Sequence, residues 1–276
     1  MYSGNVTSQE YDWKSSKSAY PYAWPLLICL LGSFRVLQED QLVPVRGHKT
    51  ITLLCQLARA YADGLPRGIL LDILWPACDA VLAAEALQNR IYSLHKLLGP
   101  ALGGAAPVVY ADGRYRLNTA AGVGTDVVCF DRWVATGDQQ ARADHVVDAA
   151  TAYQHAIHLY HGDLDLCIGT DMHALLERER VRVRYLGALS WLAEHAYAKQ
   201  DYTTSLDYAQ RLLDNEPCRE DAHRLVMRSY LRRGERAQAL RQYRLCEAIL
   251  RTEFATIPEP ATMILFEQVC RDPASI

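Results

Sequence analysis

The sequence predicts a mainly α-helical protein with small β sheets near its N-terminal end. Apolar residues recur at helical spacing through the long stretch Val81–Gly99, which is typical of an α-helix with one buried face. An Asp112-Gly113 pair between two short alternating segments predicts a β-hairpin after that helix. From about residue 125 onward, the apolar spacing is almost entirely helical.

The stretch before the long helix predicts strands and two shorter helices. Leu30–Leu37 alternates after Gly32 and ends at Glu39-Asp40, a turn signal. Val43-Pro44-Val45 follows, so a strand–turn–strand start is expected. Lys49–Tyr61 has helical spacing, and Ile69–Leu74 predicts a short second helix.

The long helix has one apolar stripe and one polar stripe. Asp79 is placed to cap its start, and Gly99-Pro100 to end it. The apolar stripe consists of Leu87, Ile91, Leu94 and Leu98. The opposite side carries Glu85, Gln88, Asn89, Tyr92, Ser93 and Lys96. These polar side chains can reach base edges in a DNA major groove, although an ordinary solvated helix face is the alternative.

The order of strands, helix, helix, long helix and hairpin is that of a winged helix-turn-helix, in which the hairpin is the wing. We therefore place a winged-helix DNA-binding domain at 26–125, after a leader at 1–25 that is expected to be flexible. An all-α domain follows at 126–276.

Two segments of the all-α part repeat at an offset of 34 residues, which predicts tetratricopeptide-like helix pairs. The matched positions are Leu192 with Val226, Ala196 with Tyr230, Ser205 with Ala239, Leu206 with Leu240, and Ala209 with Tyr243. A generic helical bundle is the alternative.

Composition narrows the class of protein further. The net charge is -3, with nine basic against seven acidic residues in 26–125 and 18 against 23 in 126–276, so the front half is mildly basic. The eight cysteines form no C-x-x-C pair, which favours reduced thiols in a cytoplasmic protein. No apolar run reaches the length of a membrane span. His155, His158 and His161 have spacings that suit a metal, but a surface or capping role is favoured. We expect no catalytic residues, metal or cofactor.

Nine short motifs occur in a fixed order along the chain. They are Leu30–Val36 (LLGSFRV), Val45–Lys49 (VRGHK), Leu71–Pro76 (LDILWP), Leu94–Pro100 (LHKLLGP), Asp112–Leu117 (DGRYRL), Tyr160–Leu164 (YHGDL), Glu177–Arg180 (ERER), Glu220–Arg224 (EDAHR) and Pro258–Thr262 (PEPAT). With this set, the chain resembles the SARP-type transcriptional activators. These are antibiotic-pathway regulators with a winged helix followed by a bacterial transcriptional activator domain. The chain departs from the family at Ser93 and His95, where arginines are usual.

The resemblance implies a sequence-specific transcription activator that binds duplex DNA at promoter direct repeats, as a homodimer, and contacts RNA polymerase. Base edges are expected to be read by Glu85, Gln88, Asn89, Tyr92 and Ser93. DNA phosphates are expected to be held by Arg46, Lys49, His95, Lys96 and Arg114. The thinned set of arginines favours an alternative, a scaffold for a protein or effector with weakened DNA binding. A third possibility is the front portion of a larger signalling ATPase, although no phosphate-binding loop occurs in this sequence.

Overall fold

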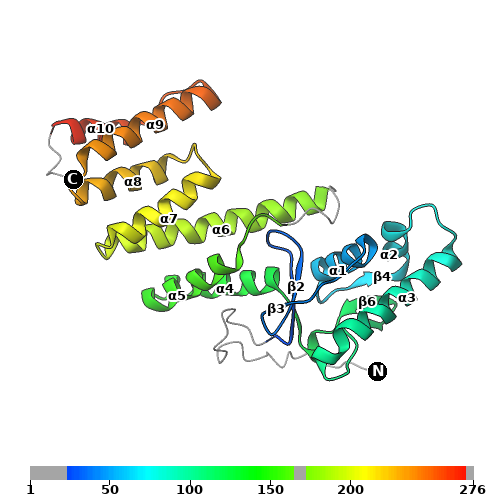
Figure 1. The fold of residues 1–276 in the computed structure, drawn as a ribbon. Helices are drawn as coiled ribbons and strands as arrows, with labels where there is room; N and C mark the ends of the chain where they lie inside the picture. The colour runs from blue at the N-terminus through cyan, green and yellow to red at the C-terminus, as the bar shows by residue number, and fades with distance from the viewer. Residues whose placement is uncertain (1–23, 165–171, 272–276) are drawn as a thin grey trace. The chain divides into compact units, whose positions relative to one another are not determined.

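The computed structural model describes residues 24–164 and 172–271, and it confirms a mainly α protein with small sheets in the N-terminal part (Figure 1). The expected flexible leader lies almost wholly outside the described residues. The described chain forms two compact units, one of 24–133 with 158–181 and the other of 134–157 with 182–271. Each unit is described by itself below, and the domain division expected at residue 126 stays a prediction.

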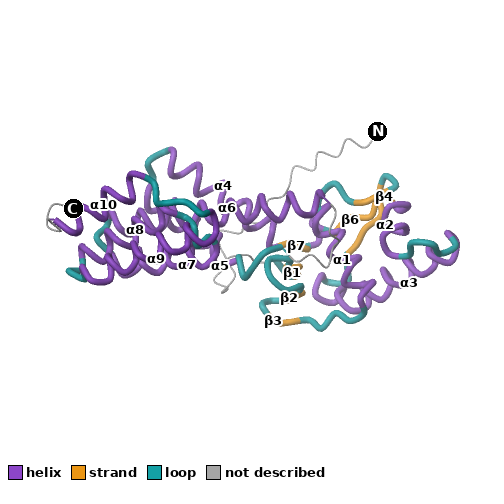
Figure 2. Tube along the Cα trace, turned by 90° about the horizontal axis from the view of Figure 1, so that it is seen from above, coloured by secondary structure: helices purple, strands orange, loops and turns teal. Residues whose placement is uncertain are grey.

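The first unit contains two separate sheets (Figure 2). The larger has the strand order β3-β2-β1-β7. Its strands are β1 (Leu26–Cys29), β2 (Arg35–Gln38), β3 (Gln41–Leu42) and β7 (Val123–Thr125). Strand β1 pairs antiparallel with β2 and parallel with β7. Glu39 and Asp40, which join β2 to β3, both have positive φ angles of 47° and 66°, as a tight hairpin turn requires.

The predicted strand–turn–strand matches β2 and the Glu39-Asp40 turn, but the second strand is Gln41–Leu42 in place of Val43–Val45, and the first strand of the sheet, Leu26–Cys29, was not predicted. All four residues of β1 are buried. A central strand that is covered on both faces shows a continuous apolar run and no alternation. The pattern in Leu30–Leu37 therefore belongs to a loop followed by β2.

The helices and the wing follow in the predicted order. The helices are α1 (His48–Ala60), α2 (Arg67–Leu74) and α3 (Ala80–Leu98), with short 3-10 turns at Gly99–Leu102 and Thr119–Ala121. The smaller sheet has the order β4-β6-β5, with β4 (Leu65–Pro66), β5 (Val108–Ala111) and β6 (Arg114–Leu117). Asp112 and Gly113 form the β5–β6 turn with φ angles of 51° and 75°. The predicted wing hairpin is confirmed.

Helix α3 is fixed at its start and along its apolar stripe. The Asp79 carboxylate accepts hydrogen bonds from the backbone N–H groups of Val81 and Leu82, at 2.9 and 3.2 Å, which confirms the expected cap. Of the apolar stripe, Leu87, Leu94 and Leu98 are buried and Ile91 is half-buried. The opposite, polar face of α3 is therefore exposed to solvent.

Asp126 joins the larger sheet to helix α4 (Asp126–Arg142). It follows directly after β7, which runs parallel to β1, so its side chain lies beside the end of β1. Its carboxylate accepts hydrogen bonds from the backbone N–H groups of Leu30 and Leu31 at 2.8 Å. Burial raises the pKa of Asp126 to about 6, while those N–H groups and Arg35 oppose the rise.

The YHGDL motif packs against the loop that follows β1. The backbone N–H of Gly32 donates to the Asp163 carbonyl at 3.0 Å, and Leu31 forms a β-bridge with Leu164. The Asp163 carboxylate in turn accepts from the Arg178 Nε at 3.0 Å and from the Tyr160 hydroxyl. The motif therefore fastens segment 158–181 to the larger sheet.

The ERER motif opens helix α6 (Met172–Ala198) and makes further ion pairs within this unit. Glu177 binds the Arg59 Nε of α1 at 3.2 Å, and Arg180 binds Asp131 of α4 at 2.9 Å. The Arg59 and Glu177 side chains are only 9% and 16% exposed. Helix α1 is thus tied to a segment that lies more than 100 residues later in the chain.

We expect Glu177→Gln to lower the free energy of unfolding by about 1.5–3 kcal/mol, because it removes a charge-assisted hydrogen bond between two largely buried side chains, Glu177 and Arg59. Glu267→Gln is the matched control, since the Glu267–Arg271 pair is 60% and 82% exposed and such surface pairs contribute little. Urea denaturation followed by helical circular dichroism measures both. Equal losses in the two variants would contradict a stabilising role for the buried pair.

The second unit is entirely helical among its described residues. Besides the later parts of α4 and α6, it contains most of α5 (Val146–Leu159) together with α7 (Tyr202–Asn215), α8 (Glu220–Arg232), α9 (Arg236–Phe254) and α10 (Pro260–Arg271). Its hairpin turns repeat at the predicted offset. Asp201 N–H donates to the Ala196 carbonyl at 2.9 Å, and Glu235 N–H donates to the Tyr230 carbonyl at 2.8 Å, 34 residues later.

The turn between α4 and α5 has the same form, which the sequence pattern did not indicate. His145 N–H donates to the Gln140 carbonyl at 2.9 Å, after Asp144 at a φ of 60°. Gln200 and Gly234 hold the corresponding positions in the later turns, with φ angles of 64° and 78°. Three different residue types fill this left-handed position, so the turn residue itself carries no repeat signal.

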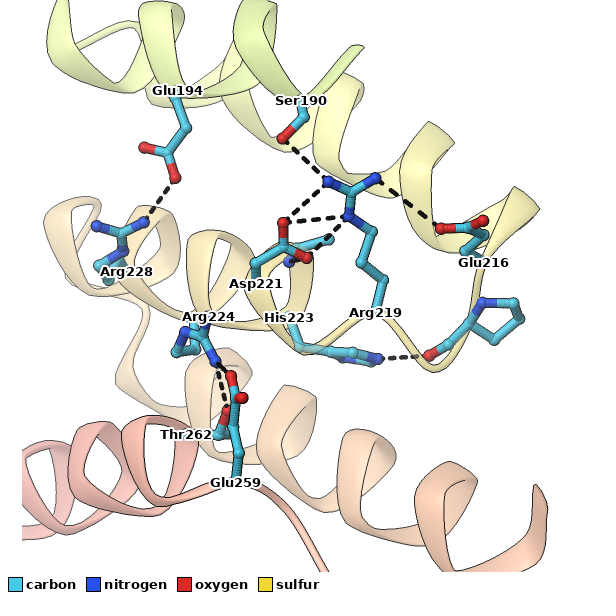
Figure 3. Close-up of polar contacts among 12 residues, drawn as sticks. Ser190, Glu194, Glu216, Arg219, Asp221, His223, Arg224, Arg228, Glu259 and Thr262 are labelled. Atoms are coloured by element: carbon cyan, nitrogen blue, oxygen red, sulfur yellow. Dashed lines mark hydrogen bonds and ion pairs between the residues drawn. The ribbon is translucent and has the colours of Figure 1, made fainter. Parts of the chain in front are cut away.

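Polar side chains link successive helix pairs of the second unit (Figure 3). Arg228 of α8 binds Glu194 of α6 at 2.9 Å, a pair separated by one repeat length of 34 residues. Arg224 of α8 pairs with Glu259, which precedes α10, and donates to Thr262 within that helix. These contacts join neighbouring repeats, as a stacked array requires.

Candidate nucleic-acid interface

The outward face of α3 carries all five side chains that we expect to read DNA bases. Glu85, Gln88, Asn89, Tyr92 and Ser93 are each exposed, and their spacings of three and four residues keep them on neighbouring turns of the helix. Tyr92 is 65% exposed, which is a high value for an aromatic side chain. The face therefore presents amide, carboxylate and hydroxyl groups together with one aromatic ring.

The amide and carboxylate groups of this face are available for an external ligand. The side chains of Glu85, Gln88 and Asn89 make no hydrogen bond with any residue that the structure describes. Ser93 differs, because its hydroxyl donates to the Asn89 carbonyl at 2.8 Å. Its oxygen can still accept a hydrogen bond, but its single hydrogen is already used.

The five side chains expected to hold DNA phosphates have different surroundings. Arg46, Lys49 and Lys96 are exposed. Arg114 of the wing is also exposed, and its Nη1 donates to the Gly64 carbonyl at 3.1 Å, which leaves other guanidinium N–H groups free to bind. The His95 ring is half-buried, and its Nε2 lies 3.1 Å from the Gly104 carbonyl. The ring of His95 is therefore engaged within the protein.

Helices α1, α2 and α3 differ from the second unit more clearly in unpaired positive charge than in net charge. Arg46, Lys49, Arg67, Arg90 and Lys96 are exposed and form no ion pair with a carboxylate of the described chain. Many arginines of the second unit, in contrast, bind carboxylates, as Arg219, Arg224 and Arg228 do. Free cations attract an anionic partner, whereas paired cations are already neutralised.

Sequence reasoning left Arg67, Arg90 and Tyr110 out of the expected site. Arg67 begins α2, and Arg90 lies on the flank of α3 between its polar and apolar stripes. Tyr110 of the wing is 56% exposed, with its ring 4.6 Å from that of Tyr115. The available signal was the lack of acidic neighbours around each arginine, which is visible in the sequence only once the helices are placed.

The histidines with metal-like spacing, His155, His158 and His161, lie just before residues 165–171, which are outside the described part of the chain. The described residues contain no group of three or more His, Cys, Asp or Glu side chains that could hold a metal ion. The His158 and His161 rings lie in a T-shaped arrangement, with centroids 6.4 Å apart and 64° between their planes. No helix among the described residues is long and apolar enough to cross a membrane.

The family model of the bacterial transcriptional activator domain matches residues 125–270. The chain belongs to this family. The resemblance to SARP-type transcriptional activators is thereby confirmed, and the family is one of transcriptional regulators, which is not an enzyme class. No curated protein sequence matches the chain.

The fold also resembles a solved structure, that of Mycobacterium tuberculosis EmbR in complex with a low affinity phosphopeptide. The two share 20% sequence identity with a TM-score of 0.70, and the match covers 89% of this chain. The chain spans 65% of the length of that EmbR chain. At this identity the likeness concerns the fold alone.

Proposed function

We propose that this protein is a sequence-specific, DNA-binding transcription activator that docks α3 in the major groove. The observation that carries the proposal is the outward face of α3, whose free amide and carboxylate groups have unpaired cations around them. An α-helix fits the major groove, where hydrogen-bond donors and acceptors distinguish all four base pairs. Asn89 and Gln88 suit adenine, and Glu85 suits the amino group of cytosine.

The phosphate contacts would come from Arg46, Lys49, Lys96 and the wing residue Arg114. His95 would add a further contact from a ring whose Nε2 lies 3.1 Å from the Gly104 carbonyl. Phosphate contacts supply affinity that falls steeply with salt, whereas base contacts supply the sequence preference. Promoter binding of this kind places the protein in the cytoplasm with its DNA.

The helical repeats would bring two copies together on the DNA and contact RNA polymerase. Each chain has a single winged helix among its described residues, so one copy covers only a short site. Linking two such binding events raises the effective concentration of the second. A homodimer on a promoter direct repeat follows from this argument and from the family.

We expect DNase footprinting to show that the protein protects two half-sites in the same orientation, on neighbouring turns of the DNA double helix. Both half-sites should fill over the same range of protein concentration, because the second binding event is favoured by the first. Protection of a single half-site, or of an inverted repeat, would contradict the head-to-tail arrangement. A duplex with one half-site scrambled is the control, and it should bind more weakly.

A protein-interaction scaffold is the second candidate function. Two observations favour it, namely Ser93 and His95 at positions where the family usually has arginine, and the engagement of His95 with Gly104. Fewer phosphate contacts mean weaker binding at physiological salt. A full-length chain that shows no preference among duplexes at low salt would support this alternative.

A further inference from the structure

One cation near the start of α1 comes from a different helix. Arg90 belongs to α3, and a Cβ atom placed on Gly47 would lie 3.9 Å from the Arg90 Nη1. Gly47 directly precedes α1 and lies between Arg46 and Lys49. Arg90 of α3 therefore lies close to the stretch of backbone at the start of α1 that carries Arg46 and Lys49.

The surroundings leave this positive charge uncompensated. The first turn of α1 contains no acidic residue. Arg46, Lys49 and Arg90 are exposed, and none forms an ion pair with a described carboxylate. Unpaired positive charges near the start of α1 favour an anionic partner.

Lys49 lies over the aromatic ring of Trp75. Its Nζ lies 4.8 Å from the centre of the Trp75 ring, within the range of a cation–π contact. Trp75 belongs to the LDILWP motif, and it follows α2 directly. This contact restricts where the ammonium group can go without neutralising its charge.

Arg90 lies at the edge of the base-reading face of α3, three residues before Ser93 and four before the buried Leu94. Successive residues of an α-helix are about 100° apart around its axis, so Arg90 points well away from its neighbour Asn89. A helix about 10–12 Å wide nearly fills a major groove about 12 Å wide. Side chains on the flank of such a helix face the phosphates of the groove wall.

We infer that Arg90, together with Arg46 and Lys49, binds the phosphodiester backbone of duplex DNA at the wall of the groove that α3 enters. The inference rests on the proposed function and assigns Arg90 a role in affinity, with none in base choice. It also accounts for affinity in a helix that lacks arginines at Ser93 and His95. Trp75 acts as a positioning residue for Lys49.

The test measures the dissociation constant of the full chain for a selected duplex and for an unrelated duplex, from 50 to 300 mM salt. We expect Arg90→Gln to reduce the slope of log K against log salt by about 0.9, the value for one phosphate contact. Binding to both duplexes should weaken roughly five- to tenfold at 0.1 M salt. Arg90→Lys keeps the charge and should keep most of the slope.

Arg244→Gln is the matched control, because Arg244 is an exposed arginine of α9 without an ion pair among the described residues. It should leave the slope unchanged. If the wild type prefers the selected duplex but Arg90→Gln keeps the full slope, the inference about Arg90 is wrong and the proposed function stands. A change in base preference in Arg90→Gln would also overturn it. If the wild type shows no preference for any duplex, the proposed function fails, and the inference fails with it.

Discussion

Asp126→Ala should lower the free energy of unfolding by about 2–6 kcal/mol. Its carboxylate accepts the backbone N–H groups of Leu30 and Leu31, and all three residues are buried. Alanine leaves both donors without a partner, and each such group costs about 1–3 kcal/mol. Natural domains have only about 5–15 kcal/mol of stability in total. The effect should appear as a lower urea midpoint, measured by circular dichroism.

Asp148→Ala is the control, because Asp148 lies exposed in the first turn of α5. It should change the free energy of unfolding by less than about 0.5 kcal/mol. Asp126→Asn keeps one oxygen that can accept a hydrogen bond, so its loss should lie between the other two. Similar midpoints for Asp126→Ala and Asp148→Ala would show that the link between β1 and α4 does not stabilise the unit.

The same carboxylate should make stability depend on pH. Burial raises the pKa of Asp126 from its usual 3.8 to about 6, so the folded state binds this proton more tightly than the unfolded state does. The stabilisation is complete below about pH 4 and is lost as the pH rises through 6, by roughly 3 kcal/mol. Urea midpoints of wild type and Asp126→Asn from pH 4 to 7 test this. The wild type should lose stability relative to the variant as the pH rises. A difference in urea midpoint that stays constant from pH 4 to 7 would contradict the raised pKa of Asp126.

Asn89→Ala should change which base is preferred within the DNA site. The exposed Asn89 amide makes no hydrogen bond with a described residue, and a side-chain amide can bind the adenine edge with two hydrogen bonds. Loss of that pair is worth about 1–3 kcal/mol of discrimination against the wrong base. Binding to a panel of duplexes that differ at single positions measures it. One position should lose its preference while the others keep theirs.

Lys96→Ala provides the contrast, because Lys96 is expected to contact phosphate. Its removal should weaken binding to every duplex in the panel and lower the salt slope by about 1. Preferences at each base position should stay as in the wild type. If both variants lose affinity evenly across the panel, the assignment of the groove-facing side of α3 is wrong.

Much of the first unit could be predicted because its local signals are strong. Asp79 and Gly99-Pro100 marked the ends of α3, and Asp112-Gly113 marked the wing turn. Each of these residues fixes the backbone within a few positions, independently of the rest of the chain. The exposed face of α3 could be predicted equally well, because helical periodicity separates its residues from the buried leucines.

The contacts between distant segments could not be predicted in the same way. The sequence does not show that the YHGDL motif packs against Gly32, through Asp163, or that the ERER motif pairs with Arg59, through Glu177. Such pairs depend on tertiary packing, which leaves no periodic signal. These contacts also bear on the stability of a fragment that consists of residues 26–125 alone. That fragment lacks Glu177, which pairs with Arg59, and Asp163, which pairs with Gly32, so we expect it to be less stable than a chain that includes residues 158–181.

Selection of bound sequences from a pool of random duplex DNA, with the full-length chain at low salt, tests the central claim most directly. We predict enrichment of one short motif, repeated in the same orientation within the selected duplexes. Asn89→Ala, selected in parallel, should enrich a motif that is relaxed at one position of each half-site. A final pool without any enriched motif, obtained from well-folded protein, would contradict sequence-specific DNA binding and favour the scaffold function.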